Sequence, residues 1–330
     1  MVKAKCWLLG VVIAGLVAGC DNSDTHLSVA RAAETPPPFV LQQGDEFFVE
    51  HGAIRLGLKP LIGGRVASLK YAGHELMKTQ DPGKKDLWGG VFWTSPQSVW
   101  SWPPIEAHDS KAYRVSIESD ALVFTSRPDA KTGFKIAKRF SVIPGSESLR
   151  FQYRIYNHSQ ETKQVAPWEI TRFKAGGLTL YPKGEDGYES GIFYLLPVKE
   201  LNGIVWQRYD MENLPKDHHK LMSDGSEGWL AYVNEGYLVV KQFEDIPAAR
   251  TAPGEGEIEL FANAERTSME LQQQGPLTTL KAGEYLEWQV LWHVQKVPQG
   301  LSVEEGSQEL VDYIRDLVAR HQSDQATPES

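Results

Sequence analysis

Residues 62–77 have the sequence IGGRVASLKYAGHELM. Gly63 and Gly64 mark a turn, and the mixed small, apolar and polar run after them predicts a short β-strand. Residues 71–74 contain a glycine in a polar setting and predict a tight turn. The residues that follow predict a second strand, so the whole segment indicates a hairpin.

The same β pattern recurs along most of the chain. Short runs that alternate or are rich in β-branched and aromatic residues lie between turn signals, as expected for strands. The clearest runs are residues 47–51, 114–117, 121–125, 149–156, 228–233, 237–243 and 285–294. Turns are indicated at residues 143–146, 234–236 and 253–256. These lengths and spacings predict one large antiparallel β-sandwich.

One helix is predicted, from Val303 to His321. Apolar residues recur there at steps of three and four, which places them on one face of a helix. This apolar stripe consists of Leu310, Val311, Ile314, Leu317 and Val318. Ser302 and Glu305 have the spacing of a capping box. We expect the stripe to pack against a sheet.

The N-terminal 20 residues indicate export. Lys3 and Lys5 precede an apolar run over residues 7–17, which is followed by Ala18-Gly19-Cys20. A positive start, a short apolar run and small residues are typical of a signal peptide. The ending resembles the lipobox of bacterial lipoproteins, which implies cleavage after residue 19 and lipidation, including palmitate, on Cys20. The alternative is an ordinary signal with an incidental cysteine.

The rest of the chain divides into four segments. We predict a proline-rich linker over residues 20–40, a β domain over 41–300, the helix within 301–322 and a disordered tail over 323–330. Asp21 resembles the signal that retains Gram-negative lipoproteins on the inner membrane, although this stretch could be a simple tether. The expected location is therefore the cell envelope, facing the periplasm.

The charge of the chain makes nucleic acid an improbable partner. The net charge is −9, and removal of Lys3 and Lys5 with the signal leaves the remainder near −11. An acidic protein without a basic cluster repels a phosphate backbone. Protein partners are not indicated by the sequence.

Three segments together resemble the aldose 1-epimerases, or galactose mutarotases. They are residues 62–77, with a Gly-Gly-Arg strand and a Gly-x-Glu-Leu turn; residues 154–173, with a strand and an Asn-x-Ser turn; and residues 269–284, with a glutamate and a turn ending in Ala-Gly-Glu. The resemblance covers about residues 45–298. It implies a galactose mutarotase-like β-supersandwich with a concave carbohydrate site and no cofactor.

The resemblance also implies candidate catalytic residues. Glu270 matches the epimerase base, whereas Glu169 occupies the position where the family has a histidine acid. Two carboxylates close together can divide the roles of acid and base, because the pair raises the pKa of one of them and leaves an acid beside a base. Arg65 and Arg172 are expected to hold the sugar. The alternative is that both glutamates lie on strands without a catalytic role.

A tryptophan-rich segment, residues 88–104, is the fourth candidate. It resembles a group of uncharacterised bacterial mutarotase-like proteins. Trp93, Trp100 and Trp102 offer flat surfaces of the kind that stack on sugar rings, and Gln97 can hydrogen-bond to hydroxyl groups. The alternative is that these tryptophans plug one end of the sandwich.

No metal site is predicted, because the histidines are scattered without ligand spacing. A calcium site in an acidic loop such as residues 184–187 remains open.

The first functional hypothesis is a membrane-tethered carbohydrate-binding protein with a mutarotase-like site, for which epimerase activity is left open. The second is a non-catalytic saccharide-binding or envelope scaffold module, which the missing histidine favours. A glycan hydrolase or lyase is the third.

Overall fold

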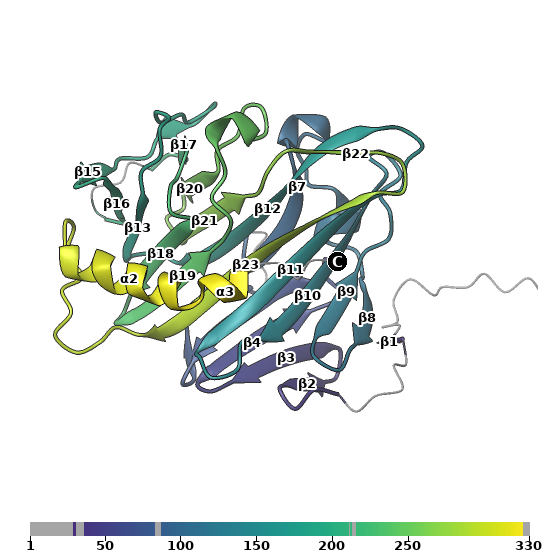
Figure 1. Ribbon diagram of the computed structural model, residues 1–330, viewed down its shortest axis with the longest axis horizontal. Coiled ribbons are helices and arrows are strands. Elements are labelled where there is room, and N and C mark those ends of the chain that lie inside the picture. The colour runs from purple at the N-terminus through teal and green to yellow at the C-terminus, as the bar shows by residue number, and fades with distance from the viewer. Residues whose placement is uncertain (1–28, 31–35, 83–86, 211, 213–215, 326–330) are drawn as a thin grey trace, which may run out of the picture.

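The computed structural model describes residues 29–30, 36–82, 87–210, 212 and 216–325. In this part of the chain two large sheets of 11 and 12 strands face each other, and helix α2 (Gln308–Arg320) lies outside the 11-stranded sheet (Figure 1). The predicted all-β sandwich with a C-terminal helix is therefore confirmed. Cys20, the signal peptide and the end of the predicted tail lie outside the described residues.

The 11-stranded sheet brings together strands from both ends of the chain. In spatial order it contains β1 (Val29–Ala30), β8 (Arg114–Ile117), β9 (Leu122–Thr125), β10 (Phe134–Val142), β11 (Ser148–Asn157), β23 (Tyr285–Lys296), β19 (Tyr237–Gln242), β18 (Trp229–Asn234), β13 (Leu178–Pro182), β16 (Ile204–Arg208) and β15 (Lys199–Leu201). Its pairs are antiparallel except for β1 with β8.

The 12-stranded sheet carries the candidate site. In spatial order it contains β14 (Tyr194–Leu195), β17 (His219–Ser223), β20 (Ile258–Ala262), β21 (Ser268–Gln274), β12 (Lys163–Lys174), β7 (Gly90–Ser95), β5 (Arg65–Tyr71), β4 (Ile54–Lys59), β3 (Glu46–His51) and β2 (Val40–Gln43), with β22 (Thr278–Leu280) on β12 and β6 (His74–Glu75) on β5. The hairpin predicted over residues 62–77 is β5 and β6, and Gly73 in its turn has φ +84°.

Aromatic side chains fill the space between the two sheets. Phe47 of the 12-stranded sheet meets Phe124 of the other sheet edge to face, at a centroid distance of 5.9 Å. Phe92 stacks flat on Tyr153 at 4.0 Å and joins the sheets again near their centre. These rings are at most 3% exposed, so the core is continuous across the sandwich.

Helix α2 begins later than the sequence suggested. Gly306 has φ +84°, and Ser307 caps the helix by accepting a hydrogen bond from the backbone N–H of Leu310. The predicted capping box at Ser302 and Glu305 is therefore wrong, because the chain turns at Gly306 before the helix starts. The predicted apolar stripe is confirmed: its residues are buried and pack on β13, β16, β18 and β19.

The shorter elements lie in loops and at the ends of the chain. They are η2 (Gln97–Val99), α1 (Glu106–Asp109), η3 (Ala248–Arg250) and α3 (Gln322–Gln325). Strand β1 falls inside the segment predicted as linker, and by pairing with β8 it covers an edge that would otherwise be open.

Candidate functional site

The two faces of β12 have different roles. Phe173 stacks on Tyr232 of the opposite sheet, and Thr171 contacts Lys241 there, so odd-numbered residues of this segment point into the sandwich. Because side chains alternate along a strand, Trp168 and Arg172 point to the outer face of the 12-stranded sheet. Both faces are buried along most of the strand, so burial alone does not distinguish them.

Glu169 lies inside the sandwich and is only 2% exposed. One of its oxygens, Oε1, accepts hydrogen bonds from Lys241 Nζ at 2.8 Å and Trp292 Nε1 at 3.1 Å. The Gln273 amide donates to the same oxygen, whereas the Tyr153 hydroxyl donates to the other oxygen, Oε2. Burial lowers the pKa of Lys241, and the charge of Glu169 opposes that shift. Glu169 is thus the acceptor of a polar network in the core.

Glu270 lies on the outer face. Its Oε1 accepts a hydrogen bond from Arg172 Nε at 2.8 Å, and its Oε2 accepts one from Gln272 Nε2 at 2.9 Å. Gln272 in turn accepts a bond from Trp168 Nε1 at 3.1 Å. The structure therefore brings Glu270 and Arg172 together but places Glu169 on the opposite side of the sheet. One sugar ring cannot contact both carboxylates.

A second ion pair lies on the same outer face. Lys220 Nζ is 2.8 Å from Glu259 Oε2, and the ammonium lies 5.8 Å from the ring centre of Trp168. Burial opposes the charge of Lys220, but Glu259 outweighs it and the pKa of Lys220 is raised. Sequence analysis missed this pair; its signal was a glutamate within the apolar run of residues 258–262.

Arg65 is anchored near the tryptophan-rich segment. Its Nη2 lies 3.0 Å from Asp109 Oδ1, and its Nη1 donates to the Trp88 carbonyl at 2.9 Å. The same Asp109 oxygen accepts a bond from Trp93 Nε1 at 3.0 Å. Burial lowers the pKa of Arg65 to about 10. Helix α1 thus supplies a carboxylate that holds two predicted site residues in place.

Two of the predicted tryptophans pack against the sheet. The ring of Trp93 meets those of Trp100 and Trp168 edge to face, at centroid distances of 5.7 and 5.6 Å. All three side chains are at most 7% exposed. Trp102 is 61% exposed, and its ring centroid lies 6.4 Å from that of Trp93. Only Trp102 of these four rings is therefore open to a ligand, and the others form a small apolar cluster on the outer face.

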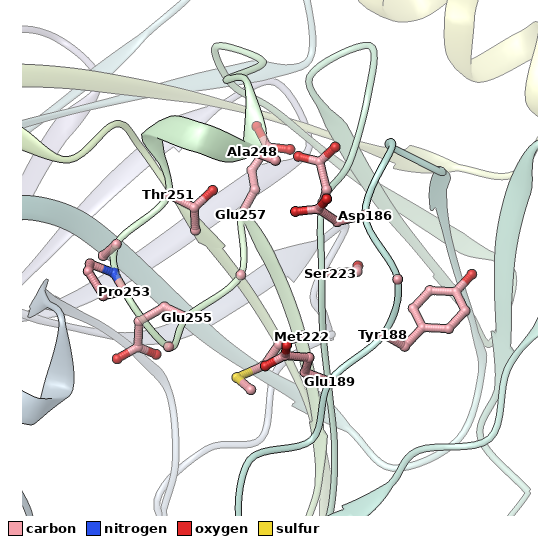
Figure 2. A pocket seen from close by; sticks show the side chains of 15 residues that line it. Asp186, Tyr188, Glu189, Met222, Ser223, Ala248, Thr251, Pro253, Glu255 and Glu257 are labelled. Carbon is pink, nitrogen blue, oxygen red and sulfur yellow. The ribbon is translucent and has the colours of Figure 1, made fainter.

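An open acidic cleft of about 500 Å³ lies beside this face (Figure 2). Met222 of β17 and the loop that ends at residue 257 line it. The carboxylates around it belong to Asp186, Glu189, Asp224, Glu255 and Glu257. Gln97 donates its backbone N–H to Glu255 at 2.8 Å, which connects the tryptophan-rich segment to the cleft.

Two of these carboxyl groups resist ionisation. Burial, and secondarily the charge of Glu259, raises the pKa of Glu255 to about 7. Burial likewise raises the pKa of Glu257 to about 8, although the backbone N–H groups of Ile246 and Gly225 partly oppose the shift. A raised pKa in a cleft is typical of a functional site, although structural carboxylates show it too.

Residues 94–295 match the family described as "Domain of unknown function (DUF4380)". The chain belongs to the DUF4380 family. No curated protein matches it. The family match includes every strand that supplies Arg172, Glu270 and Lys220, whereas Arg65 of this DUF4380 protein precedes it.

Solved structures share the fold. The Slr1438 protein from Synechocystis sp. PCC 6803 is 16% identical, with 81% of this DUF4380 chain and 99% of that chain covered, at a TM-score of 0.55. A galactose mutarotase-like protein from Lactobacillus casei is 15% identical; the match covers 76% of this chain and 100% of that chain, at a TM-score of 0.52. A galactose mutarotase related enzyme from Lactobacillus acidophilus is 10% identical; the match covers 78% of this chain and 99% of that chain, at a TM-score of 0.54. The predicted galactose mutarotase-like fold is confirmed.

Among the described residues of the DUF4380 protein, no three or more His, Cys, Asp or Glu side chains are grouped so as to hold a metal ion. Within the same residues, no helix combines the length and apolar character of a membrane span.

The raised pKa values predict how the stability of this DUF4380 protein depends on pH. A carboxyl group whose pKa is higher in the folded state stabilises the fold while protonated, and that contribution is lost as pH rises through the folded pKa. We expect Glu255→Gln to remove about 1–2 kcal/mol of the loss in unfolding free energy that these carboxyl groups cause between pH 6 and 9. Thermal melts across this range test it. Glu161→Gln, at an exposed position, should keep the wild-type slope; an equal slope in Glu255→Gln would refute the assignment.

Proposed function

We propose that this protein binds a saccharide on the outer face of the 12-stranded sheet, from Trp102 towards the acidic cleft. The observation that carries the proposal is the composition of this face. Two ion pairs, Arg172–Glu270 and Lys220–Glu259, share this face with the ring of Trp168 and lie next to an open cleft, and the exposed ring of Trp102 contacts Trp93 of the same tryptophan cluster. Sugar sites combine such charged hydrogen-bonding groups with rings that stack on the apolar faces of the sugar.

An unpaired donor on this face supports the same proposal. Arg172 is 1% exposed, and its Nη1 has no hydrogen-bond partner among the described residues. A buried donor without a partner is costly, so a ligand oxygen or a water that reaches it is favoured. The mutarotase-like fold is also consistent with a sugar ligand.

The proposal concerns binding rather than epimerisation. A mutarotase needs an acid at the ring oxygen and a base at the anomeric hydroxyl, both within hydrogen-bond reach of one sugar. Glu169 faces Lys241 and Trp292 in the core, whereas Glu270 faces Arg172 outside. The non-catalytic saccharide-binding module is therefore the hypothesis that this arrangement favours.

The proposal includes a membrane tether. Its support is the sequence of residues 1–20, with a short apolar run that ends at Cys20, and Asp21 after it favours the inner membrane facing the periplasm. Lipid chains on Cys20 would hold the binding face at the cell envelope.

The test is a glycan-array and thermal-shift screen of the full chain in detergent, with monosaccharides and envelope polysaccharide fragments. A ligand that binds only the folded protein raises Tm. We expect at least one saccharide to do so, and Trp102→Ala to weaken its affinity about tenfold through loss of stacking. Tyr285→Ala, which removes a half-exposed ring from the other sheet, is the matched control and should bind normally. The absence of a shift with every saccharide would refute the proposal.

A further inference from the structure

We propose that the acidic cleft selects a positively charged, hydroxylated ligand: an amino sugar with a free ammonium group, seated against Asp224. This inference rests on the proposed saccharide binding and specifies the class of sugar. The cleft has five carboxylate side chains among the residues that line it, and none of those lining residues is lysine, arginine or histidine.

Asp224 supplies the observation that points to a ligand. Its side chain lines the cleft although the residue is only 8% exposed. One carboxylate oxygen, Oδ2, accepts the backbone N–H of Glu185 at 2.8 Å, whereas Oδ1 is buried and has no hydrogen-bond partner among the described residues. An unsatisfied buried acceptor carries a desolvation penalty that a ligand N–H would remove. An ammonium suits it best, because it brings both a donor and a positive charge.

The backbone around Asp224 keeps this carboxylate in place. A Cβ atom on Gly184 would lie 2.1 Å from Asp224 Oδ2. A Cβ on Gly225 would lie 2.8 Å from Glu257 Oε2. Gly184 therefore needs to be glycine, because a Cβ there would also lie 2.4 Å from the backbone oxygen of Gly225, and the two carboxylates approach the backbone near the bridge between Lys183 and Gly225.

The electrostatics of the cleft favour a cation over an anion. Burial, together with the charges of Asp186 and Glu185, raises the pKa of Asp224, and Asp245 adds to the shift at Glu257. The like charges that add to these shifts give the cleft a negative potential, which attracts an ammonium and repels a uronate or a phosphate. The charge of Lys220 opposes the shift at Glu255, but Lys220 is already paired with Glu259.

The size of the cleft favours a sugar over a bare ion as its ligand. A volume of about 500 Å³ lies within the range of small-molecule sites and accommodates a ligand of one to two sugar rings. The carboxylates of Asp186, Glu189, Glu255 and Glu257 are spread around this space (Figure 2). They can accept hydrogen bonds from hydroxyl groups, while Asp224 takes the ammonium.

Calorimetry on the full chain in detergent, with a glucosamine trisaccharide and its N-acetylated counterpart, tests the inference. N-acetylation removes the charge but keeps the ring. We expect the charged sugar to bind at least tenfold more tightly, with an affinity that falls as salt rises. Asp224→Asn should weaken it at least fivefold, and Glu189→Gln is a second variant in case the first does not fold. Asp45→Asn, at an exposed turn of the same sheet, should bind like the wild type.

The possible outcomes separate this inference from the proposed function. Equal affinity for the two trisaccharides, or normal binding by both folded cleft variants, would overturn the inference and leave saccharide binding intact. Binding of spermidine without binding of any saccharide would overturn both. Loss of binding in Trp102→Ala together with selective loss of the charged sugar in Asp224→Asn would support both.

Discussion

Lys241→Met should lower the free energy of unfolding by about 3–5 kcal/mol, because it leaves the carboxylate of Glu169 buried without its counter-charge. Lys241 is completely buried, and its Nζ lies 2.8 Å from Glu169 Oε1 between the two sheets. Removing one partner of such a pair is costly because the remaining charge stays out of water. Chemical denaturation monitored by tryptophan fluorescence measures the change.

Two variants make this prediction specific. Lys183→Met breaks a partly exposed pair with Glu200 at a similar distance of 2.9 Å, and it should cost at most about 1 kcal/mol, because solvent screens that pair. Adding Glu169→Gln to Lys241→Met should recover part of the loss, since a neutral amide oxygen still accepts hydrogen bonds. If Lys241→Met were no worse than Lys183→Met, the core network would not stabilise the sandwich.

Ile314→Ala should cost about 2–5 kcal/mol, because it opens a cavity between α2 and the outer face of the 11-stranded sheet. Ile314 is fully buried in the cluster that includes Trp206 and Trp229. The same denaturation experiment measures the loss. Asp316→Ala, two residues further along the same helix and exposed, is the matched control and should change stability by less than about 0.5 kcal/mol. Equal stability of both variants would mean that α2 is not part of the cooperative unit.

Much of the fold could be predicted because its signals are local. The alternation over residues 149–156 and 285–294 corresponds to β11 and β23, which pair with each other along their length. The apolar stripe of α2 was likewise visible in the sequence. The helix start was not, because the turn at Gly306 depends on how the chain meets the sandwich.

The candidate site could be predicted only in part. Arg172 and Glu270 share one face, as the epimerase resemblance implied, whereas Glu169 does not share it. β12 is buried on both faces, so its sequence has no polar side that would show which residues point outward. The neighbouring residues Trp168 and Glu169 are separated by the sheet itself.

The sequence by itself determined the strands, the apolar side of the helix and the residue types available for binding, because these depend on spacing along a few residues. Only the tertiary structure decided which face of each strand points outward and which distant residues meet. Lys220 and Glu259 lie on paired strands, and Asp224 meets Gly184 across about 40 residues of chain. Strand order and register set these contacts, and both result from packing over the whole sandwich rather than from any short stretch of sequence.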